Sequence, residues 1–153
     1  MAQFGDFVDD DARYDLFRKT LVPGRVFVLN VNFTRPPKEK WMLLLTVEAP
    51  FLFFVINTWV SKFLRATPAL LAEQIGLLQA DEPFLDHDSI LDCSRIRIIG
   101  EAEIASEVVA DFGRIKGDIC PETRARIIDK VSHSRTLVKR DKKRICDGLG
   151  SIH

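Results

Sequence analysis

Two apolar runs in the first half of the chain restrict its fold more than any other feature. Residues 41–47, WMLLLTV, and residues 51–57, FLFFVIN, each contain a single polar side chain, and only Glu48-Ala49-Pro50 separates them. Continuous apolar runs of this length are typical of strands that are buried on both faces. So short a link joins antiparallel neighbours. We therefore predict that the two runs form an antiparallel pair at the centre of the core.

The segments around this pair suggest further strands. Apolar and polar residues alternate along 25–33, which predicts a half-buried strand. Residues 34–40 contain two prolines and charged side chains, and we expect a loop there. The β-branched segment 89–99 predicts another strand that stops at Gly100, whereas periodicity leaves 72–78 open between helix and strand.

Helices are expected at both ends of the chain. Residues 9–19 have acidic residues first and basic residues last, in the order that favours a helix. Residues 105–112 also predict a helix, and so does the stretch that begins at Pro121. A last helix near 138–149 carries a basic outer face. These elements indicate a mainly β or α+β fold with a small barrel-like sheet.

Length and composition indicate one globular domain, residues 1–153, since 46% of the 153 residues are hydrophobic. The longest purely apolar run, 51–56, is far shorter than the roughly 20 residues that cross a bilayer. The chain begins with an acidic stretch that does not resemble a signal peptide. Its three cysteines are widely spaced, as in reducing compartments. We expect a cytoplasmic protein that does not enter a membrane.

Charge is unevenly distributed although the formal net charge is zero. Residues 70–111 hold ten acidic side chains against two arginines, a net of −8, and residues 114–144 hold eleven basic against four acidic ones, a net of +7. Such halves either polarise the surface toward an anionic partner or neutralise each other within the fold. Both readings stay open at the level of sequence.

The segment 84–99 contains residue types found in metal centres and hydrolases. They are Asp86, His87, Asp88, Ser89, Asp92 and Cys93. A zinc site needs three or four converging ligands, but neighbours on a strand point to opposite faces. A serine nucleophile needs an aimed base and an oxyanion hole, and no glycine-rich turn supplies one. We interpret the segment as the polar start of a structural strand, expect no metal or other cofactor, and look for chemistry elsewhere.

The order of several segments resembles the MazF/PemK (Kid) toxin family. The resemblance is carried by VPGRVFVLNVNF (22–33), FFVINT (53–58), DSILDCSRIRII (88–99) and GRIKGDICPETRARIIDKV (113–131). It covers roughly residues 22–131 and implies an SH3-like β-barrel with a C-terminal helix, which is usually a homodimer. Residues 1–21 would then be an N-terminal helical extension, and residues 132–153 a basic helical tail.

The resemblance also implies a function. Members of the family typically cut single-stranded RNA without a metal, and a cognate antitoxin protein blocks them. The family's catalytic Arg corresponds to Lys40 here, followed by Trp41 where the family has Pro, and its Thr or Ser corresponds to Thr58. Metal-free cleavage needs a proton acceptor, a cation and a proton donor. Lysine supplies a point charge but loses the planar fork of arginine.

We therefore expect an endoribonuclease in which Lys40 is the cation and proton carrier and Thr58 is a hydrogen-bond donor. The side chains expected to hold RNA are Arg25, Arg35, Lys38, Asn57, Trp59, Ser61, Lys62 and Arg65. Trp59 would stack on bases, although packing against a sheet edge is the alternative for it and for Phe63. The rival hypothesis is a non-catalytic module of the same fold that pairs with a protein or a nucleic acid. A structural protein of a prophage or plasmid is a third alternative.

Overall fold

A computed structural model describes residues 10–150 of the chain. Residues 1–9 of the predicted N-terminal extension and residues 151–153 of the predicted tail lie outside it. In chain order the elements are α1 (Asp10–Lys19), β1 (Arg25–Val31), β2 (Lys38–Leu44), β3 (Phe51–Asn57), α2 (Lys62–Arg65), α3 (Pro68–Leu71), β4 (Gln74–Leu77), β5 (Ser89–Ile99), α4 (Glu101–Val108), the 3₁₀ turn η2 (Phe112–Arg114), β6 (Ile115–Asp118), α5 (Pro121–Ser132) and α6 (Lys139–Gly150).

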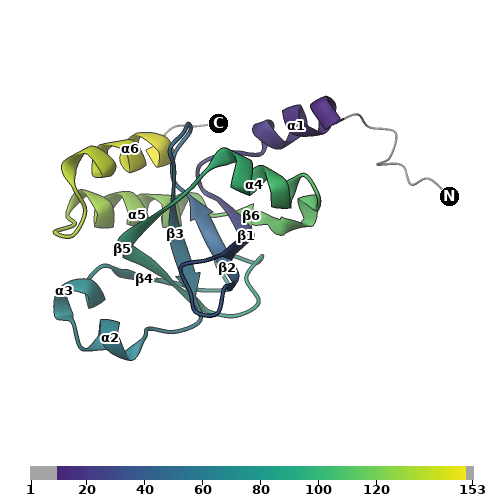
Figure 1. The fold of residues 1–153 in the computed structure, drawn as a ribbon. Coiled ribbons are helices and arrows are strands. Elements are labelled where there is room, and N and C mark those ends of the chain that lie inside the picture. Colours follow the sequence, from purple (N-terminus) through teal and green to yellow (C-terminus); the bar gives the residue numbers. More distant parts are fainter. Residues whose placement is uncertain (1–9, 151–153) are drawn as a thin grey trace.

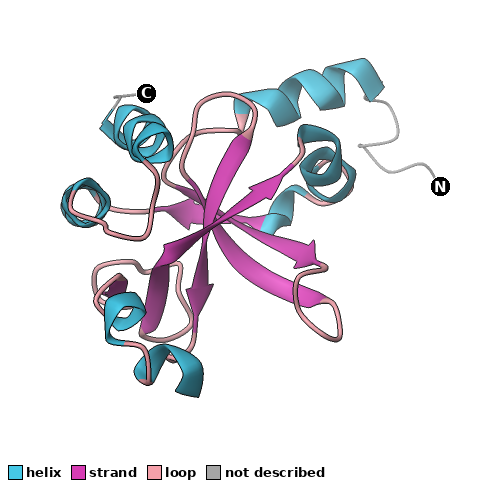
Figure 2. Ribbon diagram, turned by 60° about the vertical axis from the view of Figure 1, so that its left-hand side comes forward, coloured by secondary structure: helices cyan, strands magenta, loops and turns pink. Residues whose placement is uncertain are grey.

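The strands form one six-stranded antiparallel sheet in the order β4-β5-β3-β2-β1-β6. The sheet curls into a half-barrel, and its strands cross at wide angles in Figure 2. The molecule is thus α+β, as the sequence predicts. The predicted central pair is confirmed, because β2 and β3 are adjacent and Trp41 pairs with Ile56.

Helices cover both faces of the sheet. In Figure 1, α5 and α6 lie on one side of the strands, and α1 and α4 lie on the other. Two apolar clusters follow from this arrangement. One packs Leu43, Phe54 and other strand residues against α5 and α6, and the second packs Phe27, Phe53 and their neighbours against α1 and α4.

Because helices cover both faces of the sheet, the prediction for β1 was wrong. A half-buried strand was expected, but Val26 and Phe27 are both fully buried because each enters one of the two clusters. The predicted loop is also shorter than expected. Prolines occupy only its middle, so the backbone is free to pair from Lys38 onward, opposite Val31.

Other boundaries follow from local chemistry. Segment 72–78, left open by the sequence, contains β4. The helix expected at 105–112 is α4, which begins at Glu101 because Gly100 lies at its N-cap and two glutamates occupy its first turn. Pro121 does open α5, as predicted. No helix within residues 10–150 has the length and apolar character needed to cross a membrane.

Candidate functional site

The ends of β2 and β3 bring together two polar side chains that the sequence singled out. Because Trp41 pairs with Ile56, the adjacent Lys40 and Asn57 lie side by side, and the Lys40 ammonium donates a hydrogen bond of 3.2 Å to the Asn57 side-chain oxygen. Burial, and to a lesser extent the neighbouring charge of Lys38, lower the pKa of Lys40. Lys40 is therefore a partly desolvated cation.

Lys40 and Asn57 line a groove of about 500 Å³ at this end of the sheet. Pockets that hold ligands are commonly about 300–1,000 Å³. We call it the cationic groove. The side chains that define its chemistry are Lys40, Arg95, Arg97, Asp92, Trp59 and Phe63. They come from β2, β5 and the segment that joins β3 to β4, so the groove depends on the tertiary fold.

A large irregularity in β5 places the arginines in this groove. Asp92 pairs with Val55 and Arg97 pairs with Phe53, so five steps along β5 correspond to two along β3. Paired residues in an antiparallel sheet share a face. Asp92 and Arg97 therefore lie on the same face, although an odd spacing in a regular strand would place them on opposite faces.

The carboxylate of Asp92 is held by its neighbours. Its Oδ1 atom accepts hydrogen bonds from Gln74 Nε2 at 2.7 Å, from the Ser94 backbone N–H at 2.9 Å and from the Ser94 hydroxyl at 2.5 Å. The Gln74 amide also donates to the Leu70 carbonyl, while its own oxygen is buried without a partner. The Gln74 amide keeps this orientation because the two atoms next to Nε2, Asp92 Oδ1 and the Leu70 carbonyl oxygen, are both acceptors. The cost is that the Gln74 side-chain oxygen makes no hydrogen bond.

The two arginines of the groove carry charge that is free to meet a ligand. Among residues 10–150, neither Arg95 nor Arg97 has an ion pair within 4.0 Å. The Arg97 guanidinium lies 3.9 Å from the centre of the Phe33 ring. Burial, and then the nearby charge of Arg95, lower the pKa of Arg97, while the charge of Asp92 acts in the opposite direction. Crowded like charges of this kind favour a bound anion.

Exposed aromatic rings border the groove. Trp59 and Phe63 are 71% and 70% exposed, so neither packs against the sheet edge as the alternative interpretation required. Ser61, between them, accepts a hydrogen bond from the Leu64 backbone N–H and begins α2. Large exposed rings beside cations are suited to planar anionic ligands.

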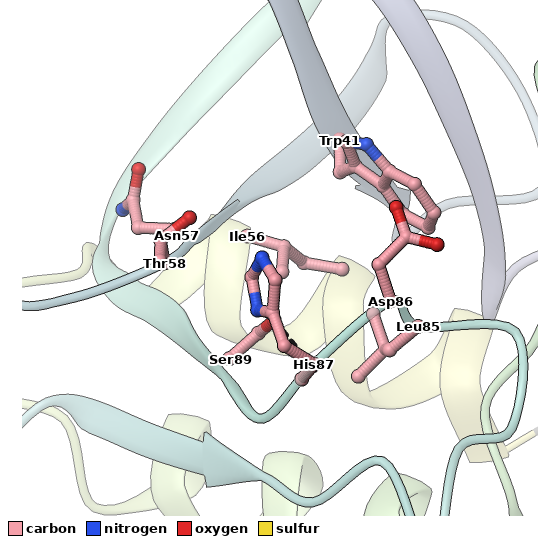
Figure 3. A pocket seen from close by; sticks show the side chains of 8 residues that line it. All are labelled: Trp41, Ile56, Asn57, Thr58, Leu85, Asp86, His87 and Ser89. Carbon is pink, nitrogen blue, oxygen red and sulfur yellow. Dashed lines mark hydrogen bonds between the residues drawn. The ribbon is translucent and has the colours of Figure 1, made fainter.

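A second, smaller pocket of about 80 Å³ lies at the other side of the β3 end (Figure 3). Asn57 lines both hollows, but Thr58 lines only this one, together with Trp41 and His87. The structure therefore brings Lys40 and Asn57 together and directs Thr58 to a different pocket. Its volume suits water or a small chemical group.

His87 and Ser89 meet in this pocket without forming a nucleophile and base. The His87 Nδ1 atom lies 2.9 Å from the Asp88 carbonyl, which can only accept, so this nitrogen carries a proton. The Ser89 hydroxyl, 3.3 Å from the same nitrogen, donates to the His87 carbonyl at 3.0 Å. Asp88 in turn accepts the Gln79 backbone N–H at 2.9 Å. These contacts are the turn contacts of a strand start.

Residues 10–150 contain no group of three or more His, Cys, Asp or Glu side chains placed to hold a metal ion.

The remaining residues proposed for RNA binding do not gather at the groove. Arg25 lies at the opposite end of β1, where its Nε atom is 2.8 Å from Asp118 Oδ1. Arg35 and Lys38 are exposed, and Lys62 and Arg65 are exposed on α2; none of these four lines the groove.

Sequence reasoning missed Arg95 and Arg97. Their two-residue spacing in a predicted strand is the available signal, because residues two apart share a face.

Comparisons with known proteins found no relative: no protein-family model matches the chain, and no curated protein matches it.

Proposed function

We propose that this chain binds single-stranded RNA in the cationic groove and cuts it without a metal. One observation carries the proposal: Lys40, Arg95, Arg97 and Asp92 line one groove, next to two exposed aromatic rings. Unpaired cations suit the phosphates of a strand. The rings suit its unstacked bases, because stacking on aromatic side chains is the usual way in which proteins hold single-stranded RNA.

The same groups match the needs of metal-free cleavage. Asp92 would accept the proton of a ribose 2′-hydroxyl, whose oxygen then attacks the adjacent phosphorus. The bond from phosphorus to the 5′-oxygen breaks, and the Lys40 ammonium donates a proton to that leaving oxygen. Arg95 and Arg97 would stabilise the charge of the phosphorane. The products are a 2′,3′-cyclic phosphate and a 5′-hydroxyl.

The proposal extends to the type of fold. A curled antiparallel sheet with a helix after its last strand is compatible with the SH3-like barrel of the MazF/PemK family. The resemblance of residues 22–131 supports the same assignment. Under it, the chain would act in a toxin–antitoxin pair, form a homodimer and be blocked by an antitoxin protein.

Cleavage of a mixed-sequence RNA in EDTA tests the activity. We expect the wild-type protein to produce fragments that end in a cyclic phosphate. Lys40→Ala should reduce the rate at least about 100-fold, since a positioned proton donor contributes about 10²–10⁴-fold. The matched control is Lys139→Ala, which removes the same charge from the exposed start of α6. Intact RNA, or equal cutting by Lys40→Ala, would contradict the assignment.

A second function is supported by the position of Thr58. The family resemblance pairs it with Lys40, yet the two line different hollows. A chain that had lost this pairing could still bind RNA without cutting it. Gel-shift or anisotropy measurements on the samples of the cleavage assay separate the two functions, because a binding module gives a complex without products.

A further inference from the structure

A third pocket lies between β1 and β5, two strands that are not neighbours in the sheet. It occupies about 220 Å³ between the end of β1 with its following loop and the end of β5. We call it the seam pocket and define it by Val31, Phe33, Pro37, Ile98 and Ile99, with Asn32 and Glu103 also lining it. These residues play no part in the function proposed above.

The seam pocket adjoins the cationic groove. Arg97 lines the groove, Phe33 lines the seam pocket, and the guanidinium of the first lies 3.9 Å from the ring centre of the second. A strand whose phosphates contact Arg95 and Arg97 therefore passes within reach of the seam pocket. Its occupant is expected to be another part of the same ligand.

Part of the apolar surface of the seam pocket is exposed, although Val31, Phe33 and Ile99 also contact the core. Ile98 is 67% exposed near the end of β5, while Leu52, the residue paired with it, is 2% exposed. Aliphatic and aromatic side chains lining a pocket of this size can cover a planar ring system. The flat face of a nucleobase meets that requirement.

Two polar side chains beside this surface are free. Among the described residues, neither the Asn32 amide nor the Glu103 carboxylate has a hydrogen-bond partner. The nearby Asn30 is different, because its backbone N–H and its amide both donate to Glu107, at 2.9 Å and 2.6 Å. Asn32 offers a donor and an acceptor, and Glu103 offers two acceptors.

We infer that the seam pocket binds a guanine base of the RNA strand; this rests on the function proposed above. Guanine presents an N1–H and an exocyclic amino group side by side, next to the O6 acceptor. A carboxylate pairs with the two donors, and the Asn32 amide donates to O6. Adenine, cytosine and uracil each lack the two adjacent donors, so they leave one carboxylate oxygen unpaired. Glu103 is exposed in the free protein, so a base that covers its carboxylate without supplying both donors removes water from one oxygen and gives nothing in return, which disfavours binding.

Anisotropy titrations with short uridine oligonucleotides that carry one central guanosine, inosine or adenosine test the inference. Inosine keeps N1–H and O6 and lacks only the amino group. We expect the wild-type protein to bind the guanosine oligonucleotide about tenfold more tightly than the inosine one, the effect of one charged hydrogen bond. Glu103→Gln should remove this preference, so that the guanosine and inosine oligonucleotides bind alike. The matched control, Glu122→Gln on the exposed start of α5, should keep it.

The outcomes separate the two proposals. Equal binding of guanosine and inosine oligonucleotides, with oligouridine still bound, overturns the guanine site and leaves the cationic groove standing. A preference that survives Glu103→Gln also overturns the site. Failure of all four oligonucleotides to bind the wild-type protein instead overturns the RNA-binding function itself.

Discussion

At the scale of single residues, the environment of Lys40 distinguishes it from the surface lysines. Its ammonium is partly removed from water, lies near Lys38 and donates to Asn57. Both burial and the like charge disfavour the protonated form, so its pKa is lower than that of an ordinary lysine. A lysine of this kind can release a proton to a leaving group more readily, and it loses its charge at a lower pH.

RNA affinity should therefore depend on pH through Lys40. The charged form binds phosphate, and the charge is lost as the pH rises through the lowered pKa of Lys40. We expect the affinity for oligouridine to fall at alkaline pH and the decline to disappear in Lys40→Arg, whose guanidinium stays protonated. Anisotropy titrations across an alkaline pH series measure both. The control Lys62→Arg, on exposed α2, should decline as the wild type does. An unchanged decline in Lys40→Arg would show that another group titrates.

The contact between Lys40 and Asn57 was within reach of the sequence. Two apolar runs joined by a short link predict an antiparallel pair, and the polar residues at the outer ends of such a pair become neighbours. Thr58 lines the smaller pocket for a local reason. It follows Asn57 directly, and consecutive residues at the end of a strand point to opposite faces.

At the scale of elements, β5 shows what the sequence could not reveal. Its limits, Ser89–Ile99, were predicted from composition. The irregularity opposite Phe53 and Val55 was not, because no glycine or proline marks it between Asp92 and Arg97. In a regular strand, residues five positions apart lie on opposite faces, so the sequence alone places Asp92 and Arg97 on opposite faces. The groove depends on a register shift that only the partner strand defines.

The packing of α6 provides a test at the same scale. A Cβ atom on Gly148 would lie 2.3 Å from the Leu45 carbonyl oxygen, a backbone atom that cannot move aside, whereas one on Gly150 would meet nothing within 4 Å. We expect Gly148→Ala to lower the free energy of unfolding by about 1–3 kcal/mol. The control Gly150→Ala should leave it unchanged or raise it by up to about 1 kcal/mol. Urea denaturation followed by circular dichroism measures both. Equal stability of the two variants would mean that α6 does not dock against Leu45 and Thr46, which follow β2.

At the scale of the whole molecule, the opposite charges of residues 70–111 and 114–144 scarcely neutralise each other. Within the described residues, the ion pair that joins the two stretches links Arg114 and Glu107, whose nearest N and O atoms are 3.7 Å apart. The buried glutamates of the acidic stretch instead accept backbone N–H groups: Glu73 from Arg135, and Glu82 from Cys120. Direct ion pairing therefore neutralises little of the charge of either stretch.

Salt should weaken RNA binding through a countable number of charges. For single strands, the logarithm of the binding constant falls against the logarithm of salt concentration by about 0.7 for each phosphate that is neutralised. We expect Arg95→Ala and Arg97→Ala each to reduce this slope by about 0.7. Lys139→Ala on α6 should leave it unchanged. Titrations at several salt concentrations measure the slopes. An equal reduction in all three variants would mean that the positive surface binds RNA diffusely rather than in the groove.

Burial of β3 on both faces has a consequence for how this sequence can change. Phe51–Ile56 are six consecutive buried residues that alternate between the two clusters. In a scan of all substitutions, they should form an unbroken intolerant block, unlike the first half of β5, where buried and partly exposed positions alternate. Few substitutions should therefore be tolerated at residues 51–56 of β3. Asn57 is the first position beyond this block, so a substitution there can change the side chains of the groove without disturbing the core.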